Sequence, residues 1–556
     1  MSSRKRTAAP KLALLLSGES RAPSAARGRR APHIEDLVSL PHPPGISPAY
    51  EGELLNFPVT ETVANELRDS DQPDSSPALI RSFLPGVEGV DPMIAVGHRF
   101  VIVTQDHKIA FFDRMGKPLP SKSGEKTNLS ATAFFEYFLK AFNADRSENN
   151  NCINRHLQFP PDAISVCDLT KYPPELPCVN EFYDTRCIYD PKTRRFFICC
   201  AARNQIWPGK PGGGFDILGR RYFAFAVSKT EDPRDGFRIW FWNDNKRIAD
   251  WPNIAVNRDK FIVTHHTEQS GKPLAYIFSV AAMLQGKSSL PHWTYNASDL
   301  GGDETTLTPV THFGDTEDLT YLVRRVGSEF QIFAFRGSPA DGGTRPKLLA
   351  TSVTFETKLP SKLGVPVYRA GKIYLTCMTM ITERVADVGG PRMGVRIVRI
   401  PVDRPSRDRL QASTDKAAGF LDHTFGRNAP EDAPDDLVSY EVPALAVNKN
   451  GVMAMVYGRV GVKTQTTLFP EARYSVYYPI EARQRRSRVL QKGDFLPTFV
   501  HEGETKSTAR HYVDKGVMDY ATAVVDPRDD RTIWMIHKFA DKASGGYKTA
   551  VGAIRP

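Results

Sequence analysis

The feature that most constrains the fold of this chain is a strand–turn–strand unit that recurs along most of its length. Each unit has two β-rich runs of roughly five to seven residues around a turn rich in Gly, Asn or Asp, which is typical of a hairpin. With almost no helical pattern between them, such recurring hairpins predict a β-propeller. The units cover residues 91–105, 184–202, 250–266, 318–335, 365–378, 441–457 and 519–537.

We therefore expect an all-β, seven-bladed propeller over residues 46–556, with insertions at about 120–180 and 402–438. The number of blades becomes six if two of these units belong to one blade, and eight if residues 53–62 form a further blade. Two stacked β-sandwich domains are the main alternative, and the repeated turn chemistry argues against them. Phe134, Phe138 and Phe142 recur at helical spacing, so a short helix over 128–142 is expected between blades 1 and 2.

The basic charge of the chain is concentrated at its beginning. Residues 1–33 contain eight Lys or Arg and one acid, out of a formal net charge of +10. The remainder is nearly balanced, which argues against nucleic-acid binding. Residues 1–45 are expected to form a disordered basic arm with no clear signal peptide, and no apolar window reaches the roughly 18 residues of a membrane span.

The seven cysteines indicate no metal or redox motif, because none of them forms a CxxC pair. We expect Cys199 and Cys377 to be buried free thiols in strands. A disulfide between Cys167 and Cys178 is the alternative use of these residues in an oxidising compartment.

A carboxylate recurs at one position of the repeat. When the units are aligned on their turn residue, an acid falls six or seven positions earlier in five of them, and a sixth acid takes a similar place. The first strand of each propeller blade lines the central channel, so these acids are predicted to ring one mouth of it. The candidates for catalysis are Asp91, Asp184, Asp250, Asp318, Glu441 and Asp519.

The second strands are predicted to bring cationic groups to the same mouth. The candidates for ligand binding are Arg203, His265, His266, Arg336, His537 and Lys538. Acids and cations packed together shift one another's pKa values, so the set could supply a general acid and base. It could also hold Ca²⁺ or another divalent cation. Alternatively, the acids accept backbone N–H bonds and fix the blade junctions.

Several stretches also resemble a family of bacterial, mostly exported β-propeller proteins. Its members carry phrases of the kind DPxVxYDxxxxRW, AVSxTxDPxGxW and WGDYxxxxVDP. The resemblance covers about residues 90–556 and implies the propeller fold without an assigned chemistry. Here Lys515-Gly-Val-Met-Asp519-Tyr520 stands where Trp-Gly-Asp-Tyr is usual. The resemblance rests on residues 91–103, 184–197, 225–237, 250–264, 441–455 and 519–534.

These observations favour a ligand-binding or interaction propeller whose acidic mouth recognises a polysaccharide or protein partner. One alternative is a hydrolase or lyase that acts on a glycan through two of the mouth carboxylates. Another is a metal-dependent enzyme that uses His266 and His537 with nearby acids. The sequence leaves open whether the chain is an enzyme, which small-molecule, glycan or protein ligand it binds, and its compartment and oligomeric state.

Overall fold

The computed structural model describes the propeller ring and parts of its connections. The described residues are 13–15, 76–86, 91–120, 128–130, 134, 181–203, 221–243, 250–266, 274–287, 289–300, 307–314, 318–326, 328–339, 344–355, 363–381, 392–402, 409–425, 438–461, 468–479, 483–495, 499–501, 504–506 and 520–556.

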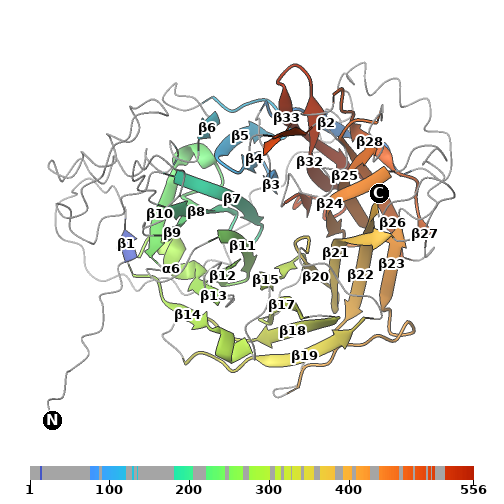
Figure 1. Cartoon of the computed structure of the whole chain (residues 1–556). Helices are drawn as coiled ribbons and strands as arrows, with labels where there is room; N and C mark the ends of the chain where they lie inside the picture. Colours follow the sequence, from blue (N-terminus) through green and yellow to red (C-terminus); the bar gives the residue numbers. More distant parts are fainter. Residues whose placement is uncertain are drawn as a thin grey trace, which may run out of the picture.

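Seven antiparallel sheets are arranged in a ring around a central channel, which confirms the prediction of a seven-bladed propeller (Figure 1). From the channel outward, blade 1 consists of β3 (Met93–Val96), β4 (Phe100–Gln105), β5 (Lys108–Asp113) and β6 (Asn128–Ser130). Blade 2 consists of β7 (Glu181–Asp190), β8 (Arg195–Arg203), β9 (Arg221–Ser228) and β10 (Phe237–Asn243). Blade 3 consists of β11 (Asp250–Asn257), β12 (Lys260–His266), β13 (Leu274–Ser279) and β14 (His292–Tyr295).

The remaining blades continue the same plan. Blades 4 to 7 consist of β15 (Thr308–Pro309), β17 (Thr320–Val326), β18 (Glu329–Phe335) and β19 (Leu349–Thr354); β16 (Thr311–His312), β20 (Val367–Arg369), β21 (Lys372–Ile381), β22 (Arg392–Pro401) and β23 (Leu421–Phe425); β24 (Val438–Val447), β25 (Met453–Gly461), β26 (Glu471–Tyr478), β27 (Arg483–Gln484) and β28 (Arg488–Gln491); and β31 (Thr522–Val525), β32 (Ile533–Asp541), β33 (Gly546–Ile554) and β2 (Arg81–Phe83).

The ring is closed by a strand from the beginning of the described region. Strand β2 pairs with β33 and forms the outer edge of blade 7, so this blade contains both ends of the propeller. The Ile80 N–H donates to the Ala553 carbonyl at 2.8 Å, and the Ser76 hydroxyl donates to the Arg486 carbonyl at 2.7 Å. The segment 76–83 therefore joins blade 7 to blade 6.

The hydrophobic core consists of seven clusters, one between each pair of adjacent blades. Strand β4 shows how the sequence builds them. Phe100 and Ile102 pack toward blade 2, whereas Val101 and Val103 pack toward blade 7. Because alternate side chains of a strand point to opposite faces, a strand between two neighbouring blades is buried on both sides. This explains why these strands read as continuous apolar runs.

Few helices accompany the strands in the described part of the chain. They are α6 (Val280–Gln285), η2 (Pro233–Asp235) and η3 (Ala297–Leu300), and none is long and apolar enough to cross a membrane. A two-stranded sheet, β29 (Phe499–His501) with β30 (Glu504–Lys506), completes the elements.

The structure corrects the beginning of the helix that was expected over 128–142. Asn128–Ser130 form β6, the outer strand of blade 1, because they pair with β5. Phe134 is helical and buried against Phe111 and Phe237, so it fills the interface between blades 1 and 2. The other positions of that expected helix lie outside the described residues.

Two further expectations concern the arm and the cysteines. Within the arm that was expected to be disordered, β1 (Ala13–Leu15) pairs with β10 at the outer edge of blade 2. Cys199 and Cys377 are free and buried, as expected of thiols within strands. Cys167 and Cys178 lie outside the described residues.

Candidate functional site

A left-handed residue marks the point where several blades begin their inner strand. Asp91, Asp184, Trp251 and Val442 have φ values of 58°, 53°, 49° and 37°. In blades 2, 3 and 6 this residue lies within a β-bulge between the first and second strands. A bulge kinks the strand and redirects its side chains. The same local geometry therefore shapes this end of the channel in several blades.

Three aspartates at this end connect neighbouring blades through backbone N–H groups. Asp91 accepts from the Tyr520 N–H at 3.3 Å, and Asp184 accepts from the Trp251 N–H at 2.9 Å. Asp106, in the turn between β4 and β5, accepts from the Asp184 N–H at 2.7 Å. These bonds agree with the structural alternative considered for the acids, in which each carboxylate fixes a blade junction.

Two cations lie among these acids. We call Asp91, Asp106, Asp184, Glu441, Arg186 and Lys538 the mouth cluster. Burial raises the pKa of Asp91 to about 6, and the charge of Asp106 adds to this shift. Burial lowers the pKa of Lys538 to about 8, while the charges of Glu441 and Asp91 partly offset it. Buried titratable groups with shifted pKa values are typical of functional sites, although structural networks also shift them.

Arg186 is a buried cation of blade 2 that contacts residues of three other blades. It is 1% exposed and donates from Nε to the Pro252 carbonyl at 2.7 Å and from Nη2 to Asn253 Oδ1 at 3.1 Å. Its guanidinium carbon lies 3.0 Å from the ring centroid of Tyr520, which is a cation–π contact. The Tyr520 ring is in turn 5.9 Å from that of Trp251, which is only partly buried.

The structure brings together only some of the predicted acids. Asp91, Asp184 and Glu441 lie at one end of the channel. Asp318 is at the opposite end, because it pairs with Lys260 beside the turn between β11 and β12. The reason is that β15, and not β17, is the innermost strand of blade 4, so Asp318 begins a strand of the opposite direction.

Relative to the left-handed residue, the predicted alignment of the acids is also wrong by one residue in blades 3 and 6. In blades 1 and 2 the acid itself is left-handed, whereas in blades 3 and 6 the next residue is. Glu441 therefore does not occupy the position of Asp91, although it still lies near Lys538. The side chain of Asp250 and the whole of Asp519 lie outside what the structure describes.

The predicted cationic residues are also separated. Lys538 belongs to the mouth cluster, and His537 lies beside it, fully buried with its pKa lowered to about 4 mainly by burial. His265 is enclosed between blades 2 and 3, with its ring 4.9 Å from that of Phe223. Arg336 precedes Gly337, whose carbonyl accepts from Lys260, so Arg336 lies at the Asp318 end. The side chains of Arg203 and His266 lie outside the described part.

The structure gives no support to the expected divalent-cation site within the residues it describes. There, no three His, Cys, Asp or Glu side chains converge in a way that could hold a metal ion. The Asp91, Asp106 and Asp184 carboxylates are instead directed to backbone N–H groups of neighbouring strands.

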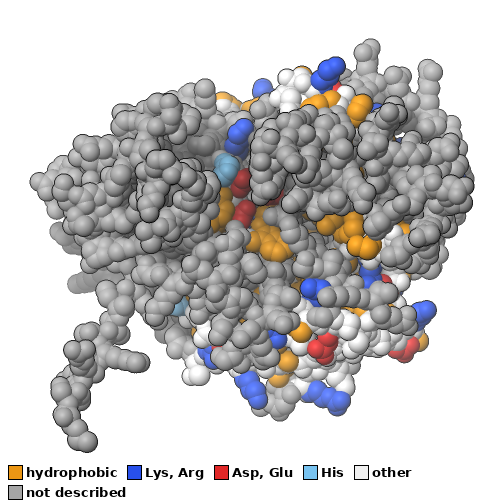
Figure 2. Space-filling view, in the orientation of Figure 1, with side chains coloured by type: hydrophobic (Ala, Val, Ile, Leu, Met, Phe, Trp, Pro, Cys, Tyr) orange, Lys and Arg blue, Asp and Glu red, His pale blue; other side chains and the backbone are white. Residues whose placement is uncertain are grey.

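Several residues of the site were not predicted. Asp106 and His107 form the turn after the second strand of blade 1, and the His107 side chain is 53% exposed. Trp251 and Tyr520 directly follow the acids Asp250 and Asp519, so the aromatic residue after the acid was a usable signal. Figure 2 shows acidic side chains and a histidine near the centre of one face, beside hydrophobic side chains.

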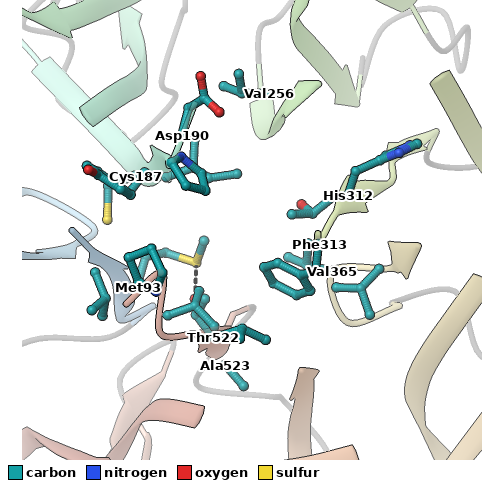
Figure 3. A pocket seen from close by; sticks show the side chains of 18 of the residues that line it. Met93, Cys187, Asp190, Val256, His312, Phe313, Val365, Thr522 and Ala523 are labelled. Atoms are coloured by element: carbon teal, nitrogen blue, oxygen red, sulfur yellow. Dashed lines mark hydrogen bonds between the residues drawn. The ribbon is translucent and has the colours of Figure 1, made fainter. Parts of the chain in front are cut away.

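Beyond the mouth cluster, the channel contains a cavity of about 250 Å³ that we call the channel cavity. It extends from Arg186 to turn residues at the opposite end, among them Asp190 and Asp526. Its wall is mostly apolar and comes from the inner strands of several blades (Figure 3). The wall of the channel cavity is thus mostly apolar, with Arg186 at the end near the mouth cluster.

Comparisons with known proteins give a distant set of similarities. No family model and no curated protein matches the chain. The extracellular domains 1–2 of Drosophila Semaphorin 1a are 10% identical over 86% of this chain and 88% of that one, with a TM-score of 0.37. The α-L-arabinofuranosidase Arb93A of Fusarium graminearum is 9% identical over 67% and 92%, with a TM-score of 0.33. Trypanosoma rangeli sialidase is 10% identical over 67% and 55%, with a TM-score of 0.30. Similarities at this level carry no argument about activity.

Proposed function

We propose that this propeller is a binding protein that recognises a polysaccharide at the mouth cluster. The observation that carries the proposal is the junction at blade 3, where Asp184 holds the backbone of the partly exposed Trp251. Next to it, the turn Asp106-His107 adds an accessible carboxylate, while the buried Tyr520 supports the Trp251 ring from within. Carboxylates accept hydrogen bonds from sugar hydroxyls, and aromatic faces provide a flat apolar contact for a sugar ring.

The charge of the mouth cluster restricts the kind of polysaccharide. Its four carboxyl groups outnumber its two cations, Arg186 and Lys538. An acidic polysaccharide would be repelled by this surplus, whereas a neutral or amine-bearing one would not. The junction hydrogen bonds also hold the site rigid, which reduces the entropy lost on binding.

The proposal can be tested by affinity electrophoresis of the full chain in gels that contain a neutral glucan, chitosan or alginate. We expect retardation by the glucan or chitosan and none by alginate. Trp251→Ala should weaken the binding that causes the retardation by roughly five- to thirtyfold, since an aromatic platform contributes on the order of 1–2 kcal/mol. Trp242→Ala, on the outer strand of blade 2, is the matched control and should leave binding unchanged.

Two results would count against polysaccharide binding. One is that the folded chain is retarded by none of the three glycans, which would favour a protein partner. The other is that Trp251→Ala and Asp106→Asn both bind like the unmodified chain. Asp106→Asn removes charge while it keeps an oxygen for the Asp184 N–H, so its fold should survive.

One observation favours the second candidate, a glycan hydrolase. Asp91 has a pKa raised to about 6 and lies near the carboxylate of Asp106, so one of the two can carry a proton while the other is charged. A protonated and an ionised carboxyl group are the pair that glycoside hydrolysis requires. The release of reducing ends from a retained glycan, abolished in Asp91→Asn, would establish this function. Binding without any release of reducing ends leaves the first proposal in place.

A further inference from the structure

The channel cavity has the size and surface of a site for a small molecule. Its volume of about 250 Å³ is that of roughly eight water molecules, since a water molecule occupies about 30 Å³. The wall is built largely from apolar side chains at the inner faces of the blades. They include Val256, Phe313, Val365, Val367, Leu445 and Ala523.

At the end of this cavity nearest the mouth cluster, the cationic group is Arg186. It lines both the channel cavity and a second cavity of about 20 Å³, so its guanidinium lies where the two meet. Its hydrogen-bond acceptors are the Pro252 carbonyl, the Asn253 amide oxygen and the Met93 thioether, at 2.7, 3.1 and 3.4 Å. In the described part of the chain, none of these acceptors is an anion.

The Arg186 guanidinium interacts electrostatically with Asp91, but its hydrogen bonds go to neutral acceptors and not to a carboxylate. A guanidinium has five N–H donors, and a thioether sulfur is a weak acceptor. Met93 is also shared, because the Thr522 hydroxyl contacts the same sulfur at 2.7 Å (Figure 3). A buried cation is costly unless an anion pairs with it. A carboxylate that entered the cavity would supply that anion in the geometry that arginine prefers.

The acids at the opposite end of the cavity would not repel a carboxylate that bound to Arg186. Asp526 and Asp530 are ion-paired with Arg114 and Arg369. Asp190 accepts from Thr193 in its own turn, and burial raises its pKa, which disfavours its charged form. The acids of this end are therefore neutralised locally, so they do not bar an anion from the cavity.

We propose that the channel cavity binds a small carboxylate with an apolar body of about eight carbons. The carboxylate pairs with the Arg186 guanidinium, and the apolar body occupies the space between the inner strands. Most of the affinity comes from the burial of apolar surface, and the ion pair fixes the orientation of the ligand. This site shares Arg186 with the mouth cluster, but the apolar body of its ligand lies in the channel and not on the polysaccharide surface proposed there.

The experiment compares octanoate with 1-octanol by isothermal titration calorimetry on the full chain. Both should bind, and octanoate should bind at least roughly tenfold more tightly, since hydrogen bonds to charged groups are the stronger ones. Arg186→Met should remove this difference while octanol binding is retained. The matched control is Arg324→Met, because Arg324 is also buried, donates to a carbonyl and an amide oxygen, and lies over a Phe ring away from the cavity.

A second variant covers the case in which Arg186→Met does not fold. Ala523→Leu places a larger side chain in the cavity and leaves Arg186 in place. It should abolish the binding of both compounds. The proposal is overturned if octanoate binds no more tightly than octanol. It is also overturned if neither compound binds the folded chain, which would mean that the cavity holds only water, or if Ala523→Leu binds both unchanged.

Discussion

The ion pair between Arg114 and Asp526 connects blade 1 to blade 7, so it allows the closure of the ring to be tested directly. Its two side chains are only 8% and 4% exposed. Arg114 also donates to the Gly97 carbonyl at 2.7 Å, and its guanidinium lies 5.2 Å from the ring centroid of Trp534. The Trp534 indole N–H donates to Asp526 at 2.9 Å.

Asp526→Asn should lower the free energy of unfolding by about 3–5 kcal/mol, because it leaves the Arg114 charge buried without its partner. The asparagine oxygen can still accept from Trp534, but its NH2 group cannot accept from the Arg528 N–H, so the loss combines the unpaired charge with one turn hydrogen bond. Urea unfolding at pH 7, followed by tryptophan fluorescence, measures the change as a shift of the transition midpoint.

Asp299→Asn provides the matched control for this prediction. It breaks the pair with Arg345, whose side chains are 38% and 22% exposed, and should cost about 1 kcal/mol or less. The double variant Arg114→Met with Asp526→Asn should be more stable than the sum of the two single losses implies. The reasoning is wrong if Asp526→Asn costs no more than Asp299→Asn, or if the two single losses add.

Three further predictions concern other parts of the ring. Because the pKa of Asp91 is raised to about 6, the folded chain keeps this proton to a higher pH than the unfolded chain. As the pH rises from about 4 to 6, the free energy of unfolding should therefore fall. Asp91→Asn should make this fall smaller, as measured by urea unfolding at each pH. Gly458→Ala should lower the melting temperature, because its Cβ would lie 2.9 Å from His537, whereas Gly546→Ala meets open space and should not. Removal of residues up to 86 should expose the edge of β33 and produce oligomers on size-exclusion chromatography; a monomer of unchanged stability would contradict this.

The blades could be predicted because their signal is local and repeated. A unit such as 250–266 contains two apolar runs and a turn, and the structure pairs these runs as β11 and β12. The closing strand β2 could not be predicted in this way, since its three residues carry no periodic pattern. Its position depends on pairing with β33, more than 400 residues later in the chain.

The mouth could be predicted only in part, because the direction of a side chain depends on details that alignment does not contain. Asp318 was misplaced because β15, with two residues including a proline, does not look like an inner strand. The bulges of blades 3 and 6 also place the left-handed φ on the residue after the acid, whereas the bulge of blade 2 places it on Asp184 itself. Arg186 was overlooked because its role depends on residues from blades 1, 3 and 7 that come together only when the ring is closed.

The pairing of β2 with β33 has a consequence for the synthesis of the protein. During translation, residues 81–83 leave the ribosome more than 400 residues before their partner strand is made. Blades 1 to 6 can pack one upon another as they emerge, but an open arc with a bare sheet edge persists until β33 is released. This edge is the part of the nascent protein that a chaperone would have most reason to cover.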